Sequence, residues 1–138
     1  MAHSLFDNKS VQKTDNLVHA IAEDGSCMIL CADTTDLVAR AEWIHRPSAT
    51  VTAALGRLLT AAGLMGALLK SENDRLTLKM QGSGEVGGLL VGADAKGHVK
   101  GYPFNASADL PLNDKGKLDV GGAIGIGILN VIKDMGLK

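Results

Sequence analysis

The strongest constraint on the fold is the segment Leu76–Phe104, in which strand-like residues are interrupted by glycine-rich turns. From Leu76 to Gln81, apolar and polar residues alternate with the two-residue period of a strand that buries one face. Turns at residues 82–84 and 94–97 then separate this strand from two further short segments, the first of them an apolar run. The sequence therefore predicts a three-stranded antiparallel meander.

The same segment contains the spacing Gly82-x-Gly84-x-x-Gly87 directly after a strand, which also occurs in dinucleotide-binding loops. Such a loop holds pyrophosphate at the N-terminus of a helix that begins at the glycines. Here Gly88–Ala93 is too short and too rich in glycine for that helix, and Asp94 comes earlier than the acidic residue of the fingerprint. We expect a glycine-kinked hairpin, and keep a small nucleotide- or phosphate-binding α+β domain as the alternative function.

A second constraint is the segment Ala49–Lys70, which is typical of one long helix capped by Ser48 and is apolar nearly all round. A helix with so little polar surface must be covered on more than one side. Its longest apolar stretch, Leu58–Leu69, is shorter than the about 20 residues that span a bilayer, so we expect no membrane partner. Together with the meander, this helix predicts an α+β fold in which antiparallel sheets pack about a buried apolar helix in β/α/β layers.

Turn and capping residues predict the elements that precede the long helix. Asp24-Gly25 tolerates a positive φ and predicts a hairpin between residues 16–22 and 26–32. Short polar side chains at residues 34–36 predict the start of a helix over Leu37–His45. We expect that helix to end just before a proline, which disfavours helical angles at the preceding residue.

At 138 residues the chain predicts a single folded domain, which we place at residues 14–138. Residues 1–13 are polar and lack the apolar region of a secretory signal, which predicts a disordered leader and a cytoplasmic protein. After a polar loop, residues 118–120 and 123–132 predict one or two further strands.

Composition argues against several functional classes. The 14 basic and 15 acidic residues nearly cancel, which gives no electrostatic case for a nucleic-acid partner. Aromatic residues make up only 3% of the chain, too few for a base-stacking surface. The sequence has no Cys–His or Ser–His pairing in sequence context, no paired carboxylates at helical spacing in an apolar setting, and no P-loop lysine. We therefore expect no enzyme and no catalytic residues.

The two cysteines, Cys27 and Cys31, lie in the second strand of the predicted hairpin. Four residues of extended chain separate them by about 13 Å, too far for a disulfide bond between them. The histidines show no metal-binding spacing; they are His3, His19, His45 and His98. We therefore expect two buried structural thiols, and no metal or cofactor in this chain.

Four strings of residues closely resemble one family over residues 14–138: AALGRLLTAAGLMGALLK, LTLKMQGSG, GADAKGHVKGY and LNDKGKLDV. It is the family of redox-regulated thirty-three-kilodalton heat-shock chaperones of bacteria. The resemblance implies a cytoplasmic, ATP-independent holdase that binds unfolding polypeptides through apolar surface and prevents their aggregation during oxidative stress.

The resemblance further implies that, in this family, four cysteines of a C-terminal module hold zinc and form disulfides on oxidation. Cys27 and Cys31 match none of these ligands. We therefore expect a truncated substrate-binding domain without the zinc switch, and constitutive client binding. A sheet cut short would leave an unpaired edge, so we also expect a homodimer or larger assembly.

Candidate client-binding residues are apolar or aromatic, because exposed apolar patches mark interaction sites. They are Trp43, Ile44, Leu89, Leu90, Val91, Tyr102 and Phe104. The pattern alone leaves open whether Leu89 and Val91 are exposed, and burial in the meander is favoured.

Overall fold

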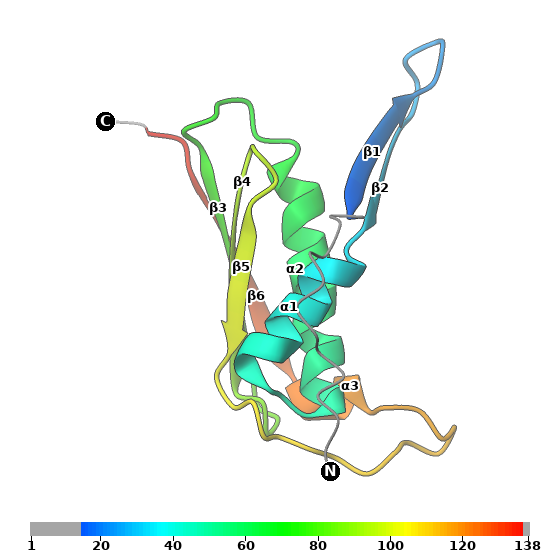
Figure 1. The fold of residues 1–138 in the computed structure, drawn as a ribbon, viewed down its shortest axis with the longest axis vertical. Coiled ribbons are helices and arrows are strands. Elements are labelled where there is room, and N and C mark those ends of the chain that lie inside the picture. The colour runs from blue at the N-terminus through cyan, green and yellow to red at the C-terminus, as the bar shows by residue number, and fades with distance from the viewer. Residues whose placement is uncertain (1–14, 137–138) are drawn as a thin grey trace, which may run out of the picture.

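The computed structural model of the protein describes residues 15–136, so the predicted leader over residues 1–13 lies outside the described residues. The chain folds into a two-stranded hairpin, a four-stranded antiparallel sheet and three helices (Figure 1). The elements are β1 (Asn16–Ile21), β2 (Met28–Asp33), α1 (Thr35–His45), α2 (Ala49–Gly66), β3 (Arg75–Gly82), β4 (Gly88–Asp94), β5 (Val99–Pro103), α3 (Val120–Ile124) and β6 (Gly127–Asp134).

The predicted meander is confirmed as β3, β4 and β5, and β6 joins it to give the strand order β5-β4-β3-β6. Alternation along β3 decides which face is buried. Leu76 and Leu78 are almost fully buried on the face that packs against α2, whereas Thr77 and Lys79 are only partly covered on the other face. Cross-strand partners share a face, so Val91 of β4, opposite Leu78, is also in the core.

Helix α2 begins as predicted, because the Ser48 hydroxyl accepts a hydrogen bond from the amide of Val51 at 3.1 Å. It ends at Gly66, earlier than the predicted Lys70. The next residues form tightened turns, in which the Leu69 amide donates to the Gly66 carbonyl. A side chain at residue 66 would meet the backbone oxygen of Asp94 at 2.8 Å, so glycine permits close contact with β4.

Helix α2 lies between the four-stranded sheet and the β1–β2 hairpin, with α1 packed across it (Figure 1). This arrangement confirms the predicted α+β fold with antiparallel sheets about an apolar helix. By length and composition alone, α2 is the one helix in the described part of the chain that could cross a membrane. Half of its residues are buried inside the fold. Core helices of other proteins can also be long and apolar enough to meet this criterion.

Helix α1 occupies the predicted position but is capped differently from the prediction. The Thr34 side chain makes no capping bond and instead lies 2.6 Å from the Thr60 hydroxyl of α2. The carboxylate of Asp15 accepts from the amides of Asp36 at 2.8 Å and Leu37 at 2.7 Å. Since Asp15 is about 20 residues away in sequence, a local search for a cap misses it.

The C-terminal part corrects one prediction and confirms another. Residues 118–120 form no strand, because α3 begins at Val120 with the Asp119 carboxylate accepting from the Gly122 amide at 2.9 Å. The second predicted strand is present as β6, but it begins at Gly127 because residues 123–124 belong to α3. It pairs with β3 along its whole length.

Candidate functional site: exposed apolar surface

The glycine motif forms a turn between β3 and β4, as the hairpin interpretation predicts. Its amides are already used: Ser83 donates to the Ile126 carbonyl, Gly84 to Ile124 and Val86 to Ala123, at 2.9 to 3.1 Å. A phosphate cradle needs free amides that converge on the ligand. Here these amides bind the segment that contains α3, so the turn does not provide such a cradle.

The glycines of this turn instead allow close packing against α3. A side chain at Gly84 would clash with the backbone oxygen of Ala123, and one at Gly82 with the backbone oxygen of Ile124. The motif therefore positions the start of β6 against the end of β3.

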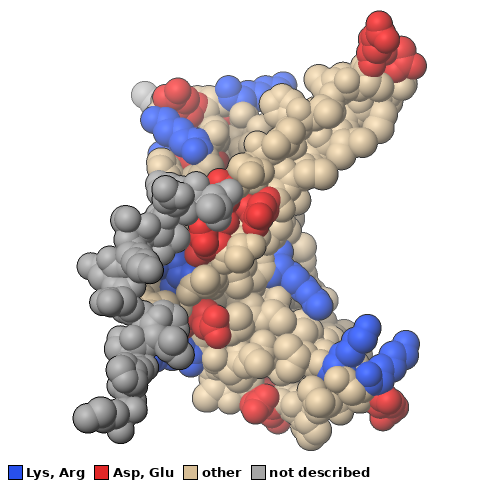
Figure 2. Space-filling view, turned by 45° about the vertical axis from the view of Figure 1, so that its right-hand side comes forward, with Lys and Arg blue, Asp and Glu red and all other residues tan. Residues whose placement is uncertain are grey.

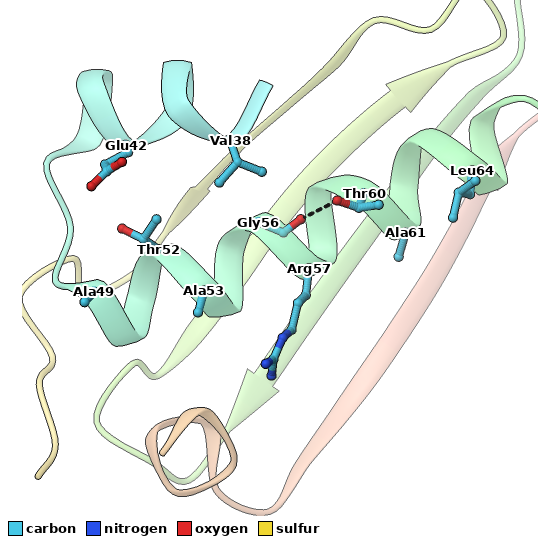
Figure 3. Close-up of a pocket in the computed structure, with 10 residues that line it drawn as sticks. All are labelled: Val38, Glu42, Ala49, Thr52, Ala53, Gly56, Arg57, Thr60, Ala61 and Leu64. Atoms are coloured by element: carbon cyan, nitrogen blue, oxygen red, sulfur yellow. Dashed lines mark hydrogen bonds between the residues drawn. The ribbon is translucent and has the colours of Figure 1, made fainter. Parts of the chain in front are cut away.

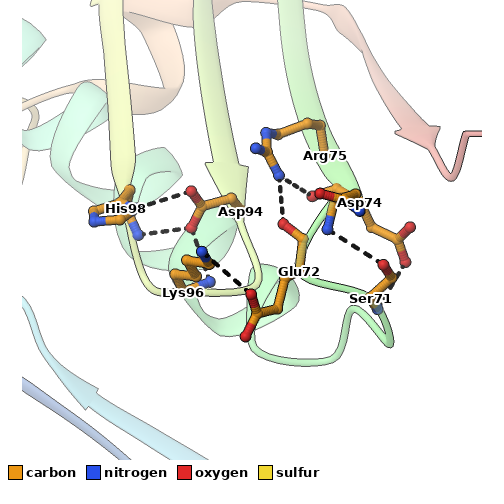
Figure 4. A network of polar contacts seen from close by, with 8 residues as sticks. Ser71, Glu72, Asp74, Arg75, Asp94, Lys96 and His98 are labelled. Atoms are coloured by element: carbon orange, nitrogen blue, oxygen red, sulfur yellow. Dashed lines mark hydrogen bonds and ion pairs between the residues drawn. The ribbon is translucent and has the colours of Figure 1, made fainter.

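A polar network at the opposite end of the sheet also has a structural role (Figure 4). The Asp94 carboxylate accepts from the amides of Lys96 at 2.9 Å and His98 at 3.0 Å, and lies 2.9 Å from Nδ1 of His98. The hydrogen bond from the His98 ring is the main cause that lowers the pKa of Asp94 to about 2. Lys96 lies 3.3 Å from Glu72 in the loop before β3. These contacts close the β4–β5 turn.

Cys27 and Cys31 are exposed free thiols, which contradicts the prediction that they are buried. The reason is that no described element covers the outer face of the hairpin. The two cysteines do not fit the four-thiolate zinc site that the family resemblance implies, because about 13 Å of strand separates them. Within residues 15–136, no group of three or more His, Cys, Asp or Glu side chains could hold a metal ion.

The β1–β2 hairpin exposes apolar residues on both of its faces. Leu30 and Ala32 are partly covered on the face toward α2, whereas Val18 and Ile29 are each 58% exposed on the other face. Figure 2 shows the hairpin as an arm with acidic side chains at its tip. Apart from Asp33 at the end of β2, its two strands contain no Asp, Glu, Lys or Arg. Strands that are apolar on both faces normally lie inside a protein, so this arm has the composition of an interaction surface.

Strand β6 is the second exposed apolar element, and every residue in it is exposed. Leu129 and Val131 lie on the helix side of the sheet, opposite Met80 and Leu78 of β3, but α2 does not cover them. Ile128 and Ile132 lie on the outer face, where they are 69% and 54% exposed.

Three of the predicted client-binding residues share the outer face of the sheet. Tyr102 of β5 pairs with Leu90 of β4, and the ring of Phe104 lies 5.9 Å from that of Tyr102. Trp43 and Ile44 are about half exposed at the end of α1, and the Arg40 guanidinium packs 4.8 Å from the Trp43 ring. Leu90 is only partly exposed.

Leu89 and Val91 cannot meet a client in this fold, because both are buried in the core on β4. Strand β4 is central in the sheet and its inner face is covered by α2. The two residues are therefore removed from the candidate surface, in agreement with the burial that the meander favours.

A groove of about 690 Å³ lies between α1 and α2 (Figure 3). Its walls are mostly small or apolar; Val38 of α1 points toward Gly56 of α2, and Ala53 and Ala61 continue the α2 side. The lining contains one carboxylate, that of Glu42, and no histidine or cysteine. The groove therefore extends the apolar surface and supplies no pair of groups for acid–base chemistry.

The candidate list from sequence omitted the hairpin and β6, which expose more apolar surface than the residues it named. A signal was present: residues 126–132 carry no charge, and apolar residues stand next to each other on both sides of Asn130. Adjacent apolar residues in a strand place apolar side chains on both faces. The pattern does not say whether such a strand lies at an edge of the sheet, because that depends on the order of the strands.

The chain is similar to known proteins over most of its length. The family described as Hsp33 protein matches residues 15–138. The chain is 54% identical over 125 residues to the 33 kDa chaperonin of Clostridium tetani, and 48% identical over 124 residues to that of Ruminiclostridium cellulolyticum. Each alignment covers 90% of this chain and 42% of the relative, so the chain spans less than half the length of these proteins.

A solved structure is similar as well. The crystal structure of the 33 kDa chaperonin from Thermotoga maritima matches with a TM-score of 0.84 and 35% sequence identity, over 88% of this chain and 42% of that chain. The resemblance predicted from four strings of residues is thereby confirmed across nearly the whole sequence: the chain belongs to the Hsp33 family.

Proposed function

We propose that this chain is a client-binding part of a holdase chaperone, which binds unfolding polypeptides through exposed apolar surface and keeps them from aggregating. The observation that carries the proposal is the presence of two exposed elements, the β1–β2 hairpin and β6, that are apolar on both faces. Unfolding proteins expose apolar segments, and burying them against such elements is favourable by about 25 cal/mol per Å². The relatives are named chaperonins, and that name agrees with a chaperone role and with the absence of enzymatic activity that we propose.

ATP independence is part of the proposal. The amides of the glycine turn are bonded to the α3 segment, which leaves no phosphate cradle there. Addition of ATP should therefore leave client binding unchanged.

We also propose that client binding by this chain is constitutive and takes place in the cytoplasm. The family resemblance implies switching through four zinc thiolates, but this chain has only Cys27 and Cys31, which are free and exposed. Elemental analysis should find no stoichiometric zinc, and peroxide should leave client protection unchanged. One tightly held zinc per chain would contradict this part of the proposal.

Suppression of aggregation tests the function directly. Light scattering of a thermally unfolding client, with and without a molar excess of the chain, should show lower scattering with it. The double variant Val18→Thr/Ile29→Thr adds hydroxyls to the outer face of the hairpin while keeping β-branched side chains. It should protect the client less than the parent chain does.

The matched control is Leu112→Thr, which removes an equally exposed leucine from the loop before α3. That variant should protect the client as the parent does. Scattering that the parent chain leaves unchanged would contradict the proposed function, whereas equal loss in all variants would contradict the assignment to the hairpin.

A further inference from the structure

The exposed end of α1 carries an aromatic ring accompanied by two arginines. Trp43 is 51% exposed, and the Arg40 guanidinium lies 4.8 Å from the centroid of its ring. Arg46, the C-cap residue three positions after Trp43, is also exposed. Residues three apart on a helix are neighbours on its surface. We refer to Arg40, Trp43 and Arg46 as the α1 cluster.

The two arginines of the α1 cluster are not neutralised by nearby acidic side chains. Within residues 15–136, neither arginine forms an ion pair with an Asp or a Glu. Glu42, next to Trp43 in the sequence, faces the groove between α1 and α2 instead (Figure 3). Asp36 precedes Trp43 by seven residues, which is about 10 Å along a helix. The cluster therefore offers two cationic groups beside a half-exposed ring.

The backbone of Arg46 is strained. Its φ of 46° and ψ of 49° lie in the left-handed region, and it is the one non-glycine residue with a positive φ among residues 15–136. This conformation is unfavourable for residues with a Cβ, and glycine commonly occupies it at the end of a helix. Pro47 adds to the strain, because a proline favours an extended residue before it. The chain thus has an arginine where a glycine would be less strained.

We propose that the α1 cluster binds client segments in which a carboxylate stands beside an aromatic or apolar side chain. A guanidinium fits a carboxylate through two parallel hydrogen bonds, and the half-exposed ring of Trp43 can pack against the apolar side chain. The inference rests on the proposed holdase function and names a class of client segment that this surface prefers. Strained residues cluster at ligand-binding sites, which agrees with a binding role for Arg46.

Trp43 is the only tryptophan in the sequence, so its fluorescence reports directly on the α1 cluster. The probe is the peptide acetyl-Gly-Asp-Phe-Asp-Gly-amide, and the control is the same peptide with Asn in place of both Asp residues. The acidic peptide should change the fluorescence and bind about three- to tenfold more tightly than the control, as two exposed ion pairs allow. Added salt should reduce this difference, because it screens exposed charges.

Charge-removing variants test each arginine. Arg40→Gln and Arg46→Gln should each weaken binding of the acidic peptide about threefold, with a smaller effect on the control peptide. Lys115→Gln removes an exposed cation from the loop before α3 and is the matched control. It should bind both peptides as the parent chain does.

Arg46→Gly separates binding from stability. An arginine at the end of a helix can also stabilise the fold alone, through the helix dipole. If Arg46 serves binding, glycine should relieve the strain and raise the melting temperature by about 3 °C, while binding of the acidic peptide weakens about threefold. A lower melting temperature with unchanged peptide binding would assign Arg46 to stability and overturn its role in the cluster.

Three further results would overturn the proposal: no fluorescence change with the acidic peptide, equal binding of the two peptides, or the same response to inorganic phosphate, which would indicate a general anion site. The peptides do not aggregate, so these measurements are separate from the light-scattering test. A chain that protects clients but does not distinguish the peptides would retain the proposed function and lose this inference. A chain that prefers the acidic peptide but protects no client would lose the proposed function.

Discussion

The two edges of the four-stranded sheet are protected very differently. At the β5 edge, the outward carbonyl of Gly101 lies 2.8 Å from Nε2 of His45, at the end of α1. The other outward residue near it, Pro103, has no N–H to offer. At the β6 edge, eight residues are exposed and no described element covers them.

This difference shows that the described residues protect one edge of the sheet and leave the other uncovered. Proteins usually blunt edge strands with charges, prolines, short length or a covering helix. The β5 edge has a covering helix, a proline, a lysine and a length of only five residues. Strand β6 has its only charges at its end, Lys133 and Asp134. Among the described residues, the same sheet therefore combines one protected edge with one unprotected edge.

The largest expected effect contrasts the core with the open edge. Leu78 is 1% exposed between Val91 and Val131 on the helix side of the sheet. Leu78→Ala should lower the free energy of unfolding by about 2–5 kcal/mol because it leaves a cavity. Ile132→Thr at the exposed edge should change it by no more than about 0.5 kcal/mol. Urea unfolding measures both, and equal losses would show that β6 is as well packed as β3.

The next effect concerns the turn that positions the start of β6. Gly84→Ala forces a methyl group against the backbone oxygen of Ala123 and should cost about 1–3 kcal/mol. The control Gly121→Ala meets only ordinary contacts in the same region and should be near neutral. Hydrogen exchange should show faster opening of β6 than of β5 in Gly84→Ala. Unchanged stability in that variant would contradict the close packing of the turn on α3.

Removing the cover of the closed edge should have a smaller effect. His45→Ala leaves the Gly101 carbonyl without its side-chain partner and should cost about 0.5–1.5 kcal/mol in unfolding free energy. Glu42→Ala, one turn earlier on α1, is the control and should be close to neutral. If the two variants were equally stable, the protection of the β5 edge would rest on its proline and short length.

The smallest expected effect is the pH dependence of the β4–β5 turn. The folded-state pKa of Asp94 is lowered to about 2 from an ordinary value near 3.8. A lowered folded-state pKa stabilises the protein above the unfolded-state value, and this contribution is lost as the pH falls through about 4 toward 2. The parent chain should therefore melt at a higher temperature than Asp94→Asn at pH 7, and the gap should narrow over that range. A gap independent of pH would contradict the role of the carboxylate charge.

The sequence could predict the elements that depend on neighbouring residues. Alternation from Leu76 to Gln81 identifies a strand with one buried face, and Ser48 identifies the start of α2. The cap of α1 was missed because Asp15 precedes β1 in the sequence, and only the pairing of Asn16 with Asp33 brings it beside the start of α1. The prediction that Cys27 and Cys31 are buried was wrong. Apolar character predicts a preference for burial, but burial also requires another element that packs against the residue.

The sequence by itself determined the hairpin, the meander, the positions of α1 and α2, and the Hsp33 family to which the chain belongs, because these depend on local patterns and on recognisable strings of residues. Only the tertiary structure decided which apolar strands lie inside. Residues 126–132 and Leu89–Val91 are similarly apolar, yet one segment is at an edge and the other is central. The physical reason is that strand order is set by long-range pairing and by the faces that α1 and α2 cover, and neither is encoded within a single strand.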